Sequence, residues 1–391
     1  MVLALDPAKI LPQDCCAGIL IGRVWLPGEG PAVVLVRDDG VFDITRAAPT
    51  VAGLLNQPDP VAIAAAAPRD RQIGAVADII ANSDAGARDG NRPWFLAPVD
   101  LQAVKACGVT FVRSLLERVV EEQARGDPAR AAAMRASLRA EIGGDLANVK
   151  PGSPAAERLK AALQQRGLWS QYLEVGIGPD AEIFTKCQPL ASVGLGADIG
   201  INPRSVWSNP EPEIVLAVNA AGTIVGATLG NDVNLRDFEG RSALLLGKAK
   251  DNNGSSALGP FLRLFDGSFS LDDVRRAEVA LEVRGTDGYV LNGNSEMGMI
   301  GRDPAELAAQ AIGPMHQYPD GFALFLGTMF APVEDRDVPG QGFTHKPGDM
   351  VTISSPKLGA LVNRVGHSDQ IPPWEFGALA LMRNLAGRGL L

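Results

Sequence analysis

Two apolar runs joined by a turn constrain the fold of this chain more than any other stretch. Residues 214–218 and 223–229 are rich in β-branched side chains, which favours β-strands. Between them, Asn219-Ala-Ala-Gly222 is typical of a turn. The two runs are therefore expected to pair as an antiparallel hairpin.

Three carboxylates stand at the open end of this hairpin. Glu211 and Glu213 are two residues apart, so their side chains point to the same face of a strand, and Asp232 lies at the end of the second run. A two-residue turn at Ala221-Gly222 places Asp232 directly opposite Glu211. A three-residue turn shifts this register and separates the cluster unless a β-bulge restores it.

Such a cluster predicts either a metal site or a solvated, polar strand edge. Three carboxylates on one face repel each other in a low dielectric, and a bound divalent cation removes that repulsion. Oxygen ligands without a neighbouring Cys or His suit Mg²⁺, with Mn²⁺ or Ca²⁺ as alternatives, rather than Zn²⁺. The residue types alone favour neither interpretation over the other.

Composition and charge argue against several classes of protein. The net charge of −9 is spread over interspersed acidic and basic residues, which is unlike a nucleic-acid or membrane-surface protein. No apolar run approaches the roughly 18 residues of a membrane helix, and the N-terminus lacks the basic start of a signal peptide. The four cysteines show no metal-binding spacing, so we expect reduced thiols in the cytoplasm, and the adjacent Cys15 and Cys16 are poorly placed to bridge each other.

The chain length of 391 residues suggests more than one small core. Strand-like runs and two short helical runs precede a polar, Gly/Asn/Asp-rich stretch at residues 68–92, which we expect to be a loop or linker. We therefore predict a small N-terminal α/β domain over 1–92 and a larger domain over 93–391. The larger part has many strand-like runs, among them 172–175, and few βα alternations, which predicts a mostly β (α+β) fold with helices outside.

Four motifs of the larger part resemble the fumarylacetoacetate hydrolase superfamily. Its metal-binding pattern matches Glu211-Pro-Glu213 followed by Asn231-Asp232-Val-Asn-Leu-Arg236-Asp237. The other motifs follow in the family's order: Lys250 before Leu258-Gly259-Pro260, then Gly327-Thr328, then Gly348-Asp349-Met-Val-Thr-Ile353. The resemblance covers roughly residues 95 to 391. It implies the family's β-sandwich roll, a metal held by Glu211, Glu213 and Asp232, and a homo-oligomer, either a dimer or a tetramer.

One departure from the family pattern narrows the expected reaction. Most members carry a His-x-x-Glu pair linked to acid–base chemistry, whereas this chain has Ser114 and Glu117 at those positions. The missing His argues against the hydrolases and decarboxylases. The replacement, together with inserted helices between residues 118 and 170, resembles the branch that dehydrates 2-keto-3-deoxy sugar acids.

The resemblance also implies roles for individual residues. Glu117 and Lys250 are the expected acid–base pair, without an assignment of which is acid and which is base, and Lys250 is expected to titrate low through desolvation. The expected substrate-binding residues are Ser114, Lys186, Arg236, Gly327 and Thr328. Lys186 either bridges substrate or pairs with a surface acid. Arg236 pairs either with a metal-ligand carboxylate or, as a plain ion pair, with Asp237 or Glu239.

The implied activity is that of a Mg²⁺-dependent hydro-lyase acting on a small 2-oxo sugar acid. It would convert a 2-keto-3-deoxy-pentonate, derived from D-xylonate or arabinonate, to 2,5-dioxopentanoate in non-phosphorylative pentose catabolism. Two alternatives stay open. One is a 2,4-diketo-3-deoxy acid hydrolase or an oxaloacetate-type decarboxylase of the same superfamily, and the other is a sugar-acid-binding protein without turnover.

Overall fold

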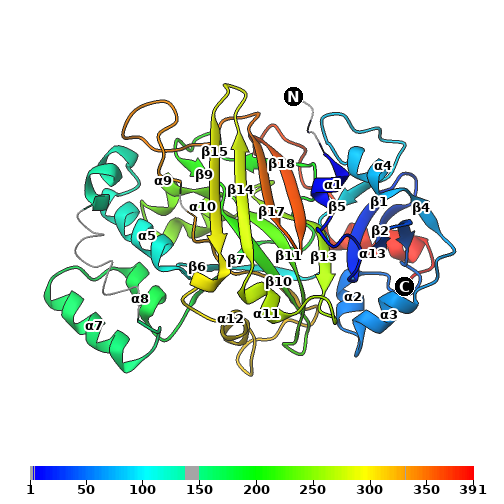
Figure 1. The fold of residues 1–391 in the computed structure, drawn as a ribbon, viewed down its shortest axis with the longest axis horizontal. Coiled ribbons are helices and arrows are strands. Elements are labelled where there is room, and N and C mark those ends of the chain that lie inside the picture. The colour runs from blue at the N-terminus through cyan, green and yellow to red at the C-terminus, as the bar shows by residue number, and fades with distance from the viewer. Residues whose placement is uncertain (1–2, 4, 137–148, 331) are drawn as a thin grey trace.

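The computed structural model describes residues 3, 5–136, 149–330 and 332–391. Two β-sheets pack against each other at its centre, and helices cover the outside (Figure 1). In the 11-stranded sheet the order is β4 (Gln72–Gly74), β3 (Gly40–Asp43), β2 (Gly30–Arg37), β1 (Leu20–Leu26), β13 (Ser256–Leu264), β11 (Ile224–Asp232), β10 (Pro212–Val218), β16 (Phe322–Phe325), β6 (Ala103–Gly108) and β7 (Glu182–Cys187), with β5 (Trp94–Leu96) beside β1.

The second sheet has five strands in the order β15 (Val290–Glu296), β14 (Glu278–Arg284), β17 (Met350–Ser355), β18 (Gly359–His367) and β8 (Asp198–Ile201). Its β14 alternates buried Val279 and Leu281 with exposed or half-exposed glutamates, as a strand with one solvated face does. In the first sheet β10 is buried along its whole length. The main core therefore lies between the sheets, with residues such as Leu216 and Leu229 on one side and Leu281 and Ile353 on the other.

The remaining elements are a two-stranded ribbon and the outer helices. The ribbon pairs β9 (Ser208–Asn209) with β12 (Asn234–Leu235). The helices are α1 (Pro7–Ile10), α2 (Val51–Leu55), α3 (Pro60–Ala66), α4 (Val76–Ala81), α5 (Val112–Ala124), α7 (Pro154–Gln165), α8 (Gln171–Ile177), α9 (Arg236–Glu239), α10 (Leu246–Lys250), α11 (Leu271–Arg275), α12 (Pro304–Ala311) and α13 (Ala378–Gly387). The predicted mostly β fold with peripheral helices is confirmed.

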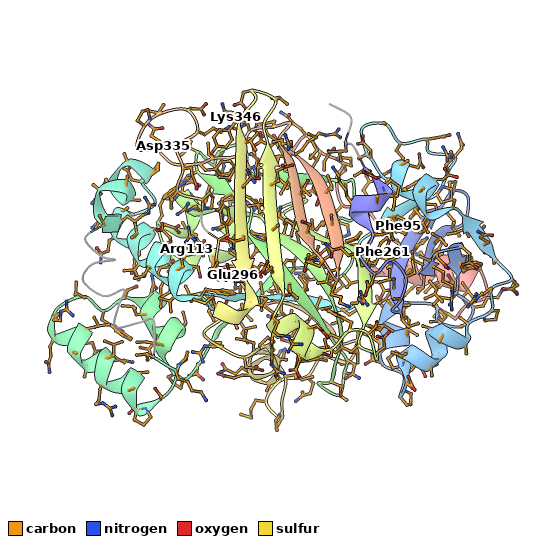
Figure 2. The ribbon with its side chains drawn as sticks, viewed as in Figure 1. Phe95, Arg113, Phe261, Glu296, Asp335 and Lys346 are labelled. Atoms are coloured by element: carbon orange, nitrogen blue, oxygen red, sulfur yellow. The ribbon has the colours of Figure 1, made fainter. Side chains whose placement is uncertain are left out.

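The N-terminal strands continue the large sheet instead of forming a separate one. β1 pairs with β13 on one edge and with β2 on the other. Phe95 of β5 and Phe261 of β13, labelled in Figure 2, pack edge to face with ring centroids 5.2 Å apart. The last helix, α13, returns to the same region, where Asn384 Nδ2 donates to the Glu29 carbonyl (2.6 Å). The division near residue 92 stays a prediction.

Two predicted segments differ from the structure. The expected loop at 68–92 contains β4 and α4. Residues 172–175, expected as a strand, lie inside helix α8, whose N-cap Ser170 accepts a hydrogen bond from the Tyr172 N–H. The buried positions Tyr172, Leu173 and Ile177 follow the helical period, and the four residues 172–175 are too few to separate the two periods.

Candidate active site

The predicted carboxylate cluster is built by the β10–β11 hairpin. Pro212 pairs with Asn231, and the Asp232 N–H donates to the Glu211 carbonyl (3.1 Å), so Glu211 lies opposite Asp232 as predicted. The turn itself differs from the two-residue prediction, because the Asn219 N–H bonds the Thr223 carbonyl (2.9 Å) around a three-residue turn. A bulge between residues 217 and 218 then restores the register. The site therefore depends on that bulge.

Glu211, Glu213 and Asp232 are buried, and each offers one carboxylate oxygen within 4.8 Å of the other two. Six-coordinate Mg²⁺ takes oxygens at 2.0–2.1 Å, so two ligands on opposite sides of the ion are about 4.2 Å apart. Adjacent ligands are about 2.9 Å apart, so a bound ion would draw the three oxygens closer together than the 4.8 Å within which they lie. The donor set and its spacing fit Mg²⁺, and a solvated strand edge is excluded by the burial.

The pKa values of Glu213 and Asp232 shift in opposite directions. Burial, and then the charges of Asp232 and Glu211, raise the pKa of Glu213 well above its usual range. The Gly327 N–H donates to Glu213 (2.6 Å) and opposes this only in part. Burial also acts to raise the pKa of Asp232, but the charges of Lys186 and Lys250 outweigh it, so that pKa is lowered.

Both candidate lysines contact the metal ligands. Lys250 Nζ contacts the Glu211 carboxylate and lies 3.1 Å from Asp232 Oδ2. Desolvation alone lowers the pKa of Lys250, but Asp232 and Glu211 outweigh it and raise that pKa above its usual value, so the expected low titration is wrong for the metal-free protein. Lys186 is fully buried, with Nζ 2.8 Å from Asp232 Oδ1, which excludes the surface ion pair that was its alternative.

Arg118 of helix α5 is a site residue that the sequence analysis missed. Its guanidinium contacts the Glu211 carboxylate and forms ion pairs with Glu121 (2.5 Å) and Glu239 (2.7 Å). Asn234 Nδ2 also donates to Glu211 (3.2 Å). The helical spacing Arg118-x-x-Glu121 places both side chains on one helix face, so the sequence did carry a signal for the pair.

Arg236 and Glu117 belong to the same buried ion-pair network. Arg236 Nε donates to Glu121 (2.6 Å), Nη1 donates to the Pro332 carbonyl (2.8 Å), and the guanidinium lies 4.2 Å from the centre of the Trp207 ring. The predicted pairing of Arg236 with a metal-ligand carboxylate, or with Asp237 or Glu239, is wrong, because its side chain extends to helix α5. Glu117 is held there by Arg135 Nε, at 2.8 and 3.0 Å from its two oxygens, and by Arg236 at 3.5 Å.

A small cavity adjoins the carboxylates, and several predicted residues meet in it. Its lining comprises Cys107, Gly108, Val109, Ser114, Arg118, Glu182, Phe184, Glu211, Glu213, Glu239, Lys250, Gly327 and Thr328. Ser114, Lys250, Gly327 and Thr328 are thus brought together as expected. The Gly327 amide is engaged by Glu213, whereas the Thr328 hydroxyl accepts from the Phe330 N–H (3.1 Å) and keeps its own proton to donate.

Glu182 is a second residue that the sequence analysis missed. It opens β7, and on a strand it shares a face with Lys186, which the sequence had already singled out, so alternation alone pointed to it. Burial, and then the nearby Glu239 charge, raise the pKa of Glu182 to about 7. A carboxyl group with this pKa is present in both protonation states at neutral pH, which suits proton transfer.

The fold and site together define the class: a two-sheet protein with a buried cluster of three carboxylates whose oxygens suit a metal ion. No family model matches the chain. A solved structure described as 2-keto-3-deoxy-D-arabinonate dehydratase complexed with magnesium and 2,5-dioxopentanoate superposes with a TM-score of 0.59 at 20% identity, covering 89% of this chain and 99% of that one. The apo form of the same dehydratase gives a TM-score of 0.59 at 19% identity over the same shares.

Two curated relatives carry related names. The 2-dehydro-3-deoxy-D-arabinonate dehydratase of Saccharolobus solfataricus is 29% identical over 187 residues, which is 47% of this chain and 58% of that protein. The probable 2-keto-3-deoxyxylonate dehydratase of Haloferax volcanii is 27% identical over 206 residues, 53% of this chain and 67% of that protein. The predicted resemblance to this branch is confirmed, while the matched segment spans little more than half of the first relative. In the described part of the chain, every helix is too short or too polar to cross a bilayer.

Proposed function

We propose that the protein is a Mg²⁺-dependent hydro-lyase that converts a 2-keto-3-deoxy-pentonate to 2,5-dioxopentanoate. The observation that carries this proposal is the cluster of buried carboxylates Glu211, Glu213 and Asp232, with Lys250 between Glu211 and Asp232, beside a cavity that Glu211, Glu213 and Lys250 line. Relatives named as dehydratases of such acids, at 27% and 29% identity, support the choice of reaction.

The three carboxylates would hold the cation. When bound, it supplies a Lewis acid that increases the acidity of hydrogens next to a 2-oxo group. Mg²⁺ is the proposed native ion, with Mn²⁺ and Ca²⁺ as alternatives. Lys186, buried against Asp232, offsets the negative charge of the ligands, and Arg118 and Asn234 fix the orientation of Glu211. Thr328 offers a hydroxyl donor at the cavity wall for an oxygen atom of the substrate, whereas the Ser114 hydroxyl, which donates to the Phe111 carbonyl (3.0 Å), offers an acceptor.

Dehydration needs one group to take a proton from C3 and another to protonate the hydroxyl that leaves C4 as water. In the metal-free protein Asp232 and Glu211 raise the pKa of Lys250, which favours its ammonium form, so we assign it to the leaving hydroxyl. For the C3 proton we favour Glu182 over the predicted Glu117, since Glu182 lines the cavity whereas Glu117 is bonded to Arg135. A hydrogen then moves from C5 to C3, and the resulting enol at C4–C5 becomes the aldehyde.

The test is incubation of the purified protein with Mg²⁺ and either 2-keto-3-deoxyxylonate or 2-keto-3-deoxyarabinonate, with detection of the aldehyde product. We expect 2,5-dioxopentanoate to form, EDTA to stop its formation, and added Mg²⁺ to restore it. Cleavage of a diketo acid or release of CO₂ from oxaloacetate, with no aldehyde from either pentonate, would favour the alternative enzymes. We also propose that the protein is located in the cytoplasm and assembles as a homodimer or homotetramer.

A further inference from the structure

Cys15 and Cys16 form a pair of thiols outside the candidate active site. Their sulfur atoms lie 3.6 Å apart, and both side chains are half-buried. Cys15 has φ = 50°, in the left-handed region that residues other than glycine seldom adopt. Consecutive side chains normally diverge along an extended chain. The turn at Cys15 instead brings the two sulfur atoms together.

Hydrogen bonds of Cys15 and of the preceding Asp14 hold this turn in place. The Cys15 N–H bonds the Pro12 carbonyl (2.8 Å). The preceding Asp14 accepts from both terminal nitrogens of Arg263, each at 2.8 Å, and from Lys357 (3.0 Å). Arg263 belongs to β13 and is buried, so the sulfur separation is set by contacts to the sheet.

A disulfide between these two residues would be strained. Disulfides usually span Cα atoms about 4.4–6.8 Å apart, whereas neighbours in the chain are about 3.8 Å apart. One atom inserted between the sulfurs relieves this mismatch. With bonds of about 2.3 Å and a bend near 100°, an inserted atom holds two sulfurs roughly 3.5 Å apart, whereas a linear centre holds them about 4.6 Å apart. The observed 3.6 Å matches the bent centre.

The residues around Cys15 and Cys16 limit which atom could bridge their two sulfurs. Structural zinc takes four protein ligands. The neighbouring oxygen ligand, Asp14, is already engaged by Arg263 and Lys357. Throughout the described ranges, the one group of three or more metal-ligating side chains found is the Glu211, Glu213 and Asp232 cluster. Trivalent arsenic forms a bent centre of this kind. It binds two protein sulfurs and takes its third bond from a group outside the protein.

We propose that Cys15 and Cys16 form a dithiol site for trivalent arsenic, as arsenite or an organoarsenical. Each S–H bond is replaced by an As–S bond. With phenylarsine oxide, the oxygen on arsenic takes both thiol protons and leaves as one water molecule. With arsenite, two hydroxyl groups leave as two water molecules. The oxidation state of arsenic does not change, so no oxidant or reductant is required.

Burial of the Cys16 thiol disfavours ordinary thiol oxidation but does not disfavour the condensation with arsenic. It raises the pKa of the Cys16 thiol to about 12, and the hydrogen bond with Cys15 adds to the shift. Thiolates are the species that attack peroxides and disulfides, so Cys16 is a poor nucleophile in those reactions. Condensation with arsenic consumes neutral thiols and releases water, so it does not require net ionisation.

The test uses the full, reduced protein and phenylarsine oxide, followed by intact mass spectrometry. We expect one phenylarsenic group per chain, with loss of two hydrogens, released by 2,3-dimercaptopropanol but not by excess glutathione. C15S and C16S should each lose the adduct, whereas C107S, which changes a buried cysteine elsewhere, should keep it. An adduct that persists in C16S, or none on the wild type, overturns the proposal.

A second measurement tests whether tight arsenic binding requires the folded protein, or whether two adjacent cysteines in an unfolded chain bind arsenic equally well. The competing concentration of 2,3-dimercaptopropanol that removes half of the arsenic is measured for the native and the urea-unfolded chain. We expect the native protein to need at least tenfold more competitor. Equal concentrations for the two states would contradict a site set by the turn.

Discussion

Asp232 lies directly across the hairpin from Glu211, and the ammonium group of Lys250 contacts the carboxylates of both. Glu213, the third carboxylate, has the amide of Gly327 as its donor instead of a lysine. The positive charge is therefore shared unequally among the three carboxylates, and the pKa values of Glu213 and Asp232 shift in opposite directions before any cation binds.

This inequality predicts that Mg²⁺ binding releases protons. Burial and the charges of Asp232 and Glu211 raise the pKa of Glu213 well above its usual range, which favours the protonated carboxyl group in the metal-free protein. Metal binding requires the carboxylate, so the proton must leave, and Mg²⁺ affinity should rise with pH. Titration calorimetry in buffers of different ionisation enthalpy measures this release. A binding enthalpy that does not depend on the buffer would contradict it.

Arg118 should control metal affinity through Glu211. Loss of a group that orients a metal ligand typically costs about 10–100-fold in affinity or activity. We expect Arg118→Met to weaken Mg²⁺ binding and lower kcat by such a factor, and Arg118→Lys to recover part of the loss. Arg113→Met is the matched control, because Arg113 lies on the same helix and is exposed (Figure 2). Equal effects of the two methionine variants would show that Arg118 serves stability alone.

Glu182 and Glu117 can be separated by the same conservative change. If Glu182 is the base, activity rises with pH as its carboxyl group ionises, with an inflection at or below the pKa of about 7, since a nearby cation favours the charged form. We expect Glu182→Gln to remove this inflection and to lower kcat by about two to four orders of magnitude. Glu117→Gln should keep the inflection. Loss of the inflection in Glu117→Gln, together with its retention in Glu182→Gln, would instead assign the role of base to Glu117.

The Asp14–Arg263 pair predicts a pH dependence of stability. The hydrogen bonds from Arg263 lower the pKa of Asp14 to about 2. A depressed folded-state pKa stabilises the protein above the unfolded value of 3.8, and this contribution is lost as the pH falls toward 2. Asp14→Asn should lower the free energy of unfolding by about 1 kcal/mol at pH 7, after allowance for solvent screening, and by less near pH 3. Urea unfolding at both pH values measures the difference, and a cost that does not shrink at low pH would contradict it.

The sequence predicted the cluster of Glu211, Glu213 and Asp232 because side-chain alternation and register are local properties. The pairing of Glu211 with Asp232 followed from counting residues to the turn, although the structure reaches the same register through a bulge. Helix α8 was missed because a pattern of four residues, 172–175, does not distinguish a helix from a strand. Its assignment depends on the cap at Ser170 and on packing against α5.

The partners of Arg118, Arg236 and Glu117 could not be predicted in the same way. These ion pairs join helix α5 to residues about 90 to 120 positions away, and their formation depends on how the helix packs on the sheet. The helical spacing of Arg118 and Glu121 could be recognised in the sequence, but the contact of Arg118 with Glu211 could not. The separation of the Cys15 and Cys16 sulfur atoms depends likewise on a backbone conformation that no residue type at that position indicates.

The account depends above all on a cation held by Glu211, Glu213 and Asp232. The most direct test is a crystal of the protein grown or soaked with Mn²⁺ and measured for anomalous scattering. We predict one manganese peak per chain in contact with these three carboxylates, and its absence from crystals of Glu213→Gln. A peak at another position, or no peak in the wild-type protein, would contradict the account.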